Sequence, residues 1–127
     1  MTDMGTFRTE VEIESAERRG PRRALGGMLV DTGSELTWVP AGELEALGIT
    51  PARTMRFRQA TGTVVERRVG FAIVHVGGTS TADDIVFGEP GDLSILGART
   101  LEGLNVAIDP VSKRLVDAGP MLGAAVA

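Results

Sequence analysis

The chain has 127 residues, enough for one domain, and 43% of them are apolar, so a buried core can form. Its net charge is −4, and its arginines are scattered among acids, which argues against a nucleic-acid partner. It has no cysteine, which excludes disulfides, thiolate metal sites and a cysteine nucleophile. The first residues hold no apolar stretch, so we expect no signal peptide and no membrane partner. We therefore expect a cytoplasmic location.

The N-terminal part reads as two strands joined by a charged turn. Residues 7–14 alternate between two faces and predict a half-buried strand, with Glu14 among the solvent-facing acids. Residues 18–23, "RRGPRR", predict a hairpin loop, because Gly and Pro mark turns. Residues 24–31 are apolar on both faces and predict a central strand that ends at Asp31.

The remainder alternates further strands with short helices. A strand over 36–39 and a helix over 40–48 are predicted next. Gly70 is expected to mark a bend or bulge in the long strand that follows. The other predicted elements are a hairpin of 54–59 and 64–76 around 60–63, strands at 83–87 and 93–97, a helix at 98–104, and 105–109 and 113–116 flanking a turn. Glycine-rich turns and few aromatics fit this mostly-β pattern.

The stretch "LVDTGS" places an acid at the end of a buried strand. On its own, Asp-Thr-Gly is weak, since a shuffled chain of this composition would carry it about once in eleven cases. On the tripeptide alone, turn chemistry after a strand is the favoured interpretation. Its context is more specific, because the glycine-tipped hairpin "ATGT" and then "ILG" before a short helix follow it in order.

With these three motifs, the chain resembles retropepsin-type aspartic proteases, the single-domain relatives of the pepsins. The resemblance covers about residues 7–116. It implies an all-β, closed, barrel-like fold with a flap hairpin and one or two short helices. It also implies one domain over residues 1–127, with a core at about 7–116, and neither a metal nor a cofactor.

The resemblance assigns a role to each motif. Asp31 would be the catalytic carboxylate that activates a water, in a chain that hydrolyses peptide bonds. Thr32 would reach the matching loop of another copy, and Gly33 would permit the tight turn. The implied supporting residues are Thr32, Gly33 and Ser34 in the active-site loop, Ala60, Thr61 and Gly62 in the substrate-binding flap, and Ile95, Leu96 and Gly97 beside the site.

An aspartic protease needs two carboxylates, and this sequence holds one such motif. Asp109 is predicted to be a turn residue, and Asp83 and Asp84 to lead a strand. The second carboxylate is therefore expected from a second copy, in a homodimer with Asp31 of both chains at its two-fold axis. The apolar tail, residues 117–127, is expected to add a strand to the dimer interface, or else to form a disordered end.

Three further side chains have more ordinary interpretations. A Ser34 hydroxyl bonded to the carboxylate would favour its charged form, which predicts an acid-shifted pH optimum. His75 is the only histidine and is expected to be a packed or edge residue, not a ligand. Trp38 is expected to pack in the core or border a substrate pocket.

Two other functions remain open from the sequence. The chain could be a catalytically inactive dimerisation or peptide-binding module of the same fold, although such a module would not need the acid at Asp31. It could also be an unrelated β-barrel binding module with a chance motif, but "ILG" at its position would then have no explanation.

Overall fold

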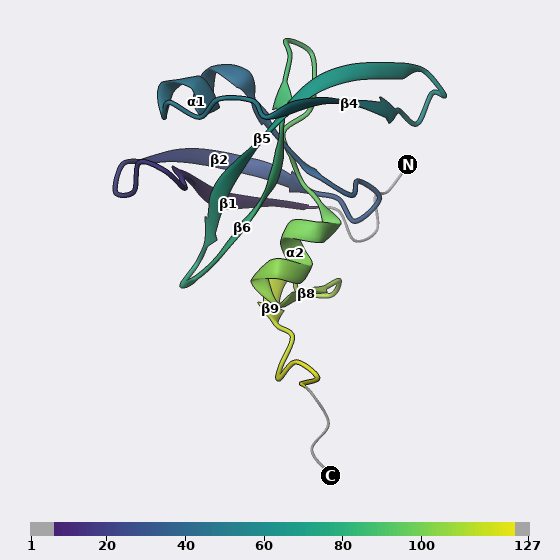
Figure 1. Ribbon diagram of the computed structural model, residues 1–127. Helices are drawn as coiled ribbons and strands as arrows, with labels where there is room; N and C mark the ends of the chain where they lie inside the picture. Colours follow the sequence, from purple (N-terminus) through teal and green to yellow (C-terminus); the bar gives the residue numbers. More distant parts are fainter. Residues whose placement is uncertain (1–6, 124–127) are drawn as a thin grey trace.

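The computed structural model describes residues 7–123 and is built mainly of β-strands, with two short helices (Figure 1). In chain order the elements are β1 (Phe7–Ser15), β2 (Arg22–Val30), β3 (Thr37–Pro40), α1 (Ala41–Ala46), β4 (Arg53–Arg58), β5 (Val64–Val76), β6 (Thr79–Gly88), β7 (Ile95–Leu96), α2 (Ala98–Leu104), β8 (Val106–Asp109) and β9 (Arg114–Asp117). In this part of the chain, no helix combines the length and hydrophobicity that crossing a membrane requires.

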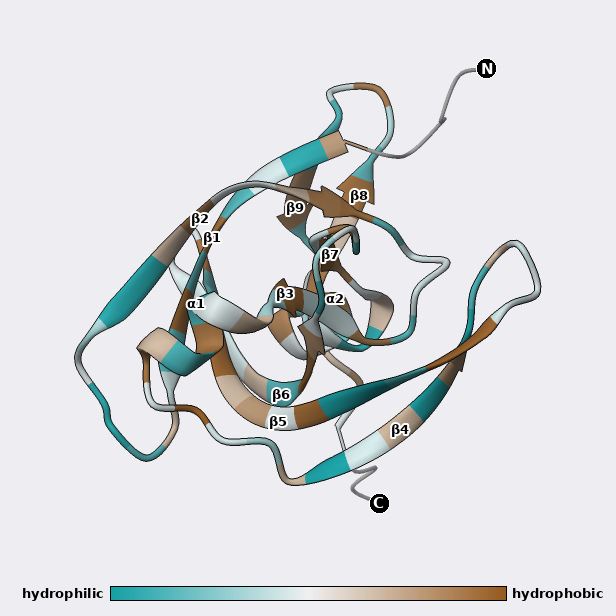
Figure 2. Cartoon of the chain, turned by 90° about the horizontal axis from the view of Figure 1, so that it is seen from above, coloured by the Kyte–Doolittle hydropathy of each residue, from teal (hydrophilic) through white to brown (hydrophobic). Residues whose placement is uncertain are grey.

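The main sheet closes on itself. Its strand order is β1-β2-β7-β3-β6-β5-β4, and an additional pairing of β1 with β5 joins six strands in a ring. Figure 2 looks down on this ring, with the β4–β5 hairpin extending past it. The expected closed, all-β architecture is confirmed, and β8 and β9 form a separate two-stranded sheet.

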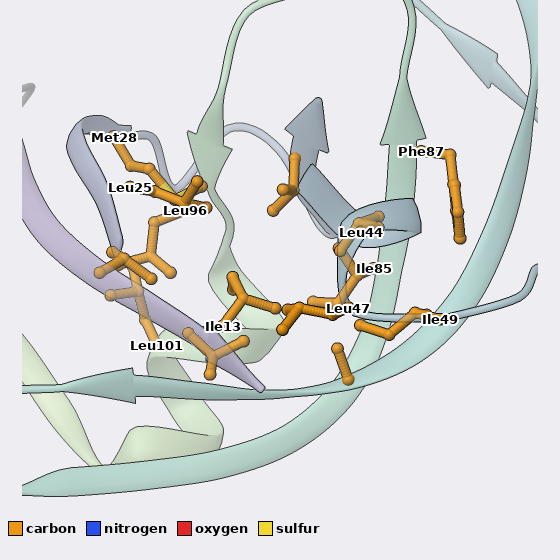
Figure 3. Close-up of a cluster of buried hydrophobic side chains, with 14 of the residues drawn as sticks. Ile13, Leu25, Met28, Leu44, Leu47, Ile49, Ile85, Phe87, Leu96 and Leu101 are labelled. Atoms are coloured by element: carbon orange, nitrogen blue, oxygen red, sulfur yellow. The ribbon is translucent and has the colours of Figure 1, made fainter. Parts of the chain in front are cut away.

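The apolar side chains gather in two clusters. The larger one fills the ring, with contributions from β1, β2, β5, β6 and both helices (Figure 3). The smaller one consists of Leu36, Trp38, Val69 and Val86 and lies against the β4–β5 hairpin, where Met55 and Phe57 pack on it. The second cluster therefore couples the hairpin to the body of the domain.

The β-bulge lies elsewhere than expected. The β5–β6 register runs unbroken through Gly70, which opposes Ile85, so Gly70 marks no bulge. A Cβ at Gly70 would lie 2.9 Å from both the Phe87 ring and the Thr50 carbonyl oxygen, which explains the glycine. The irregularity is in the β1–β2 pair, where Gly26 and Gly27 together oppose a single residue of β1.

One other expectation differs from the structure, and one stays untested. Glu14 was expected to face solvent, but its side chain is 3% exposed because hydrogen-bond partners surround the carboxylate. Within the single chain, the tail forms no strand after β9 in the described residues, and Met121 and Leu122 are exposed, so its strand in a dimer interface stays a prediction. The part of the tail expectation that concerns residues 124–127 lies outside the described residues.

Candidate active site

Asp31 directly follows β2, at the point where β2 runs parallel to β7. Val30 pairs with Leu96, and the Asp31 amide then donates to the Leu96 carbonyl at 3.1 Å. The Asp31 side chain is partly exposed, and Thr32 and Gly33 are exposed. One hydrogen bond to the carboxylate is found among the described residues, from the Gly33 amide at 2.9 Å. The carboxylate is thus fixed in direction while much of it stays open.

The loop after Asp31 is held by the start of α2. The amides of Ala98 and Arg99 donate to the carbonyls of Ser34 and Glu35, at 2.8 and 3.0 Å. The preceding Gly97 packs directly on this loop, and a Cβ there would overlap the Leu36 carbonyl and lie 2.9 Å from the Ser34 oxygen. The "ILG" motif and the loop therefore form one tightly packed unit.

A buried chain of hydroxyls lies beneath the loop. The Gly97 amide donates to Thr37 Oγ1 at 2.9 Å, and Thr37 Oγ1 lies 2.6 Å from Thr100 Oγ1. Thr100 in turn donates to Asp83 Oδ2 at 3.0 Å. Because the Thr100 proton goes to Asp83, Thr37 is the donor to Thr100. The sequence pattern did not predict these hydrogen bonds between side chains. Their only signal was a polar residue within each apolar segment.

Ser34 does not act on the Asp31 carboxylate in this structure. Its hydroxyl donates to the Leu36 carbonyl at 2.8 Å. The expectation of a Ser34–Asp31 hydroxyl bond is wrong, since the turn after Gly33 directs the hydroxyl back to the chain. The acid-shifted pH optimum loses the reason on which it was based.

An open groove of about 820 Å³ lies beside Asp31. Its floor includes Asp31 and Ile95. Trp38 borders the groove, which agrees with one of the two expectations for this residue. The β4 arm and Ala60 form one wall, and Gly91, Asp92 and Leu93 form another. The groove therefore brings the loop after Asp31, the β4–β5 hairpin and the β6–β7 connection to one place.

The β4–β5 hairpin, which holds the predicted flap residues, ends in a tight turn. The Gln59 amide donates to the Thr63 carbonyl and the Gly62 amide to the Gln59 carbonyl, both at 2.8 Å. Gly62 has a φ of 91°, which suits glycine. Thr61 and Gly62 are exposed at the tip, and Ala60 reaches the groove.

Arg67 and Asp92 form an ion pair beside the groove. Arg67 Nε and Nη2 donate to the two Asp92 oxygens at 2.7 and 3.0 Å, and the side chains are 14% and 10% exposed. The Arg67 hydrogen bonds hold the pKa of Asp92 below its usual value, against the opposing effect of burial. The same bonds raise the pKa of Arg67. Neither residue was singled out from the sequence.

The histidine belongs to a different cluster. His75 Nε2 lies 2.7 Å from Glu14 Oε1, and neither residue lines the groove. Hydrogen bonds from Arg19, the Gly20 amide and His75 lower the pKa of Glu14 to about 2. His75 is a packed residue, as expected. Among residues 7–123, no group of histidine and acidic side chains is arranged to hold a metal ion.

Two comparisons with known proteins agree with this geometry. A family model described as "Aspartyl protease" matches residues 20–108. Among solved structures, the solution structure of the Simian Foamy Virus (mac) protease matches with a TM-score of 0.51 and 22% identity, covering 75% of this chain and 91% of that one. No curated protein sequence matches the chain.

The two findings carry different weight. At this identity, the viral structure shows a shared fold. The family model spans well over half of the chain, from the β1–β2 hairpin through the Asp31 loop to β8. The chain therefore belongs to the aspartyl protease family, and it is an aspartic endopeptidase with a retropepsin-type fold.

Proposed function

We propose that two copies of this chain form one aspartic endopeptidase, with an Asp31 from each copy in a shared site. The observation that carries the proposal is the state of Asp31 itself. Its carboxylate lies on the floor of a groove under a flap and accepts one hydrogen bond within the described chain, from Gly33. The sequence holds one Asp-Thr-Gly, so the second carboxylate comes from a second copy.

Two such carboxylates side by side divide the chemistry between them. Close carboxylates share one proton, because two negative charges a few ångströms apart repel strongly. The ionised acid accepts a proton from a water that attacks the scissile carbonyl, and the protonated acid donates to the carbonyl oxygen. A two-fold axis makes the two acids equivalent until the substrate binds.

The neighbouring residues support this arrangement in distinct ways. Thr32 is exposed at the loop tip, where a second copy can meet it. Gly33 orients the carboxylate through its amide. The residues beside the site are Ser34, which holds the loop, and Ile95, Leu96 and Gly97, which support it from below.

The flap and the floor together bind the peptide. Ala60, Thr61 and Gly62 close over a substrate that lies extended in the groove, and backbone groups bind it as an added strand. Closure excludes bulk water from the site and retains the attacking water, which strengthens the electrostatic interactions there.

The tail contributes to the dimer in this proposal. Met121 and Leu122 are 73% and 101% exposed, and apolar side chains this open gain from a partner surface. A chain ending at Val116 should dimerise more weakly in analytical ultracentrifugation. Equal dimerisation by the short and full chains would remove the tail from the interface, without touching the catalytic proposal.

The catalytic proposal is tested by mixing two forms of the chain. Asp31→Asn should abolish cleavage of an extended apolar peptide. The control Asp109→Asn, at the start of the β8–β9 turn, should leave cleavage unchanged, because an Asn side chain also accepts the hydrogen bond of such a turn. A threefold excess of Asp31→Asn added to the wild type should lower the rate to about a quarter, because most wild-type copies then have an inactive partner.

The rate of the wild type alone should fall more steeply than linearly on dilution. A pepstatin-type transition-state analogue should inhibit the wild type and should bind Asp31→Asn weakly. Cleavage that survives Asp31→Asn, or that is unaffected by the inactive partner, would contradict the shared site.

A further inference from the structure

The flap hairpin projects beyond the closed sheet. Strand β5 pairs with β6 only from Val69 onward, so the segment Val64–Arg68 has β4 as its one partner strand. Figure 2 shows β4 and this part of β5 extending away from the ring. A two-stranded ribbon alone is marginally stable in water, so contacts with the body must hold it over the groove.

Among the contacts between the hairpin and the body, two involve residues that line the groove. The first is apolar: Phe57 of β4 meets Trp38 edge to face, with ring centroids 5.1 Å apart. The second is the ion pair between Arg67 of β5 and Asp92, in the connection between β6 and β7. Arg67 lies two residues past the last β5–β6 pairing, at the base of the projecting ribbon.

The geometry of the ion pair suits an anchor. Both Asp92 oxygens accept from the Arg67 guanidinium, so the pair fixes direction as well as distance. The guanidinium carbon lies 5.9 Å from the centroid of the Trp38 ring, and Asp92 also accepts from the Glu89 amide at 2.8 Å. The pair thus joins the flap base, the groove tryptophan and the opposite wall.

The next residue shows that this arrangement is specific to one side of β5. Arg68 packs its guanidinium over Phe87, 5.0 Å from the ring centroid, and pairs with the exposed Glu45 at 3.6 Å. Arg68 is absent from the lining of the groove, as is Arg67, but it makes no contact with the groove-lining Asp92. It therefore offers a matched control for the loss of one arginine.

We propose that the Arg67–Asp92 ion pair anchors the base of the flap and positions the flap over Asp31. Both are positioning residues, since Arg67 is not on the groove surface and the Asp92 carboxylate is used by Arg67. The effect of this ion pair on catalysis rests on the proposed protease function, whereas the anchoring of the flap base does not.

The anchoring is tested on the full-length chain by hydrogen exchange. Arg67→Gln and Asp92→Asn should each speed exchange of the flap amides, residues 54–67, by about tenfold or more, because each leaves a charged hydrogen-bonding partner unsatisfied. Exchange in β1 and β2 should stay as in the wild type. Arg68→Gln should leave flap exchange unchanged, and the double variant should match the single ones. Arg67→Lys should fall between, since lysine keeps the charge but loses the two-pronged geometry.

The kinetic part is tested on a peptide that the wild type cleaves. KM should rise about tenfold in Arg67→Gln and Asp92→Asn, with a smaller change in kcat, because a loose flap mainly weakens substrate binding. Flap exchange as slow as in Arg68→Gln, or faster exchange spread over the whole chain, would overturn the anchor. Faster flap exchange with unchanged KM would overturn its role in positioning. A wild type that cleaves no peptide would contradict the proposed function, while the exchange data would still decide the anchor.

Discussion

Glu14 and Asp31 are two acids at or near the ends of neighbouring strands, and their surroundings differ sharply. Glu14 is almost wholly buried and bonds to Arg19, the Gly20 amide and His75. Asp31 is partly exposed and, within residues 7–123, accepts one bond, from Gly33. A carboxylate surrounded by partners stabilises a fold, whereas one held in direction but left open can bind a water, a substrate or a second copy.

The largest expected difference between the two acids is in catalysis. Asp31→Asn should lower the rate of peptide cleavage by at least about a thousandfold and leave stability nearly unchanged, since Asn can still accept from Gly33. Glu14→Gln should keep the rate per folded molecule within about twofold. Initial rates of the two variants test this difference. They are measured at an enzyme concentration above which the rate per molecule no longer rises, and they are corrected for the folded fraction. A comparable loss in both variants would end the distinction.

Close packing around the Asp31 loop should make it the less tolerant region. Gly97→Ala should lower the free energy of unfolding by about 3 kcal/mol, because its Cβ would overlap a backbone carbonyl. Gly78→Ala, in the β5–β6 turn near His75, should stay within about 0.5 kcal/mol, because a Cβ there meets no atom within 4 Å. Urea unfolding compares the two, and equal losses would show that the loop relaxes around the extra methyl group.

The hydroxyl chain under the loop should contribute a smaller amount. Thr37→Val should cost about 2 kcal/mol, since it leaves the buried Gly97 amide without an acceptor. Cleavage should fall as well, because Gly97 packs on the loop that carries Asp31. The same urea series detects the loss, and a Thr37→Ser variant, which keeps the hydroxyl, should recover most of it. A Thr37→Val variant as stable as the wild type would contradict this contribution, because valine keeps the γ-methyl group and lacks only the hydroxyl.

Glu14 should also make the stability of the fold depend on pH. Because folding lowers its pKa from about 4.5 to about 2, the ionised carboxylate stabilises the fold above about pH 4.5, and this contribution is lost as pH falls toward 2. The urea midpoint of Glu14→Gln should therefore lie below that of the wild type at neutral pH and converge with it near pH 2. Glu12→Gln, which removes an exposed pair with Arg22, should show little change. A gap that persists at pH 2 would mean that charge is not the cause.

The same comparison shows what the sequence could predict. The strands and both helices follow from local pattern, and the active-site loop, the hairpin and "ILG" are each contiguous, so the Asp31 site was recognisable by its order along the chain. Glu14 was expected to face solvent, because the alternation of side chains along β1 carries no information about His75, which is 61 residues away in the sequence. The Thr37–Thr100–Asp83 chain and the Arg67–Asp92 pair likewise exist only after distant segments meet.

Ser34 illustrates a different limit. Its identity and position next to the acid were known from the sequence, yet its hydroxyl bonds to Leu36. Which of two nearby acceptors a hydroxyl chooses depends on a single side-chain rotation and on the turn that follows. Residue type and spacing do not determine that choice.

Gly70 and Gly97 have a consequence for recognising relatives of this chain. At each, a methyl group would collide with a backbone carbonyl from another segment, Thr50 in one case and Leu36 in the other. Substitution at either is penalised sterically, whatever the chemistry of the site. Together with Asp31 they form a three-point fingerprint, of which two points report the fold and one reports the proposed catalytic acid. On the proposed role of Asp31, a homologue that keeps both glycines and lacks the acid would have kept the scaffold and lost the activity.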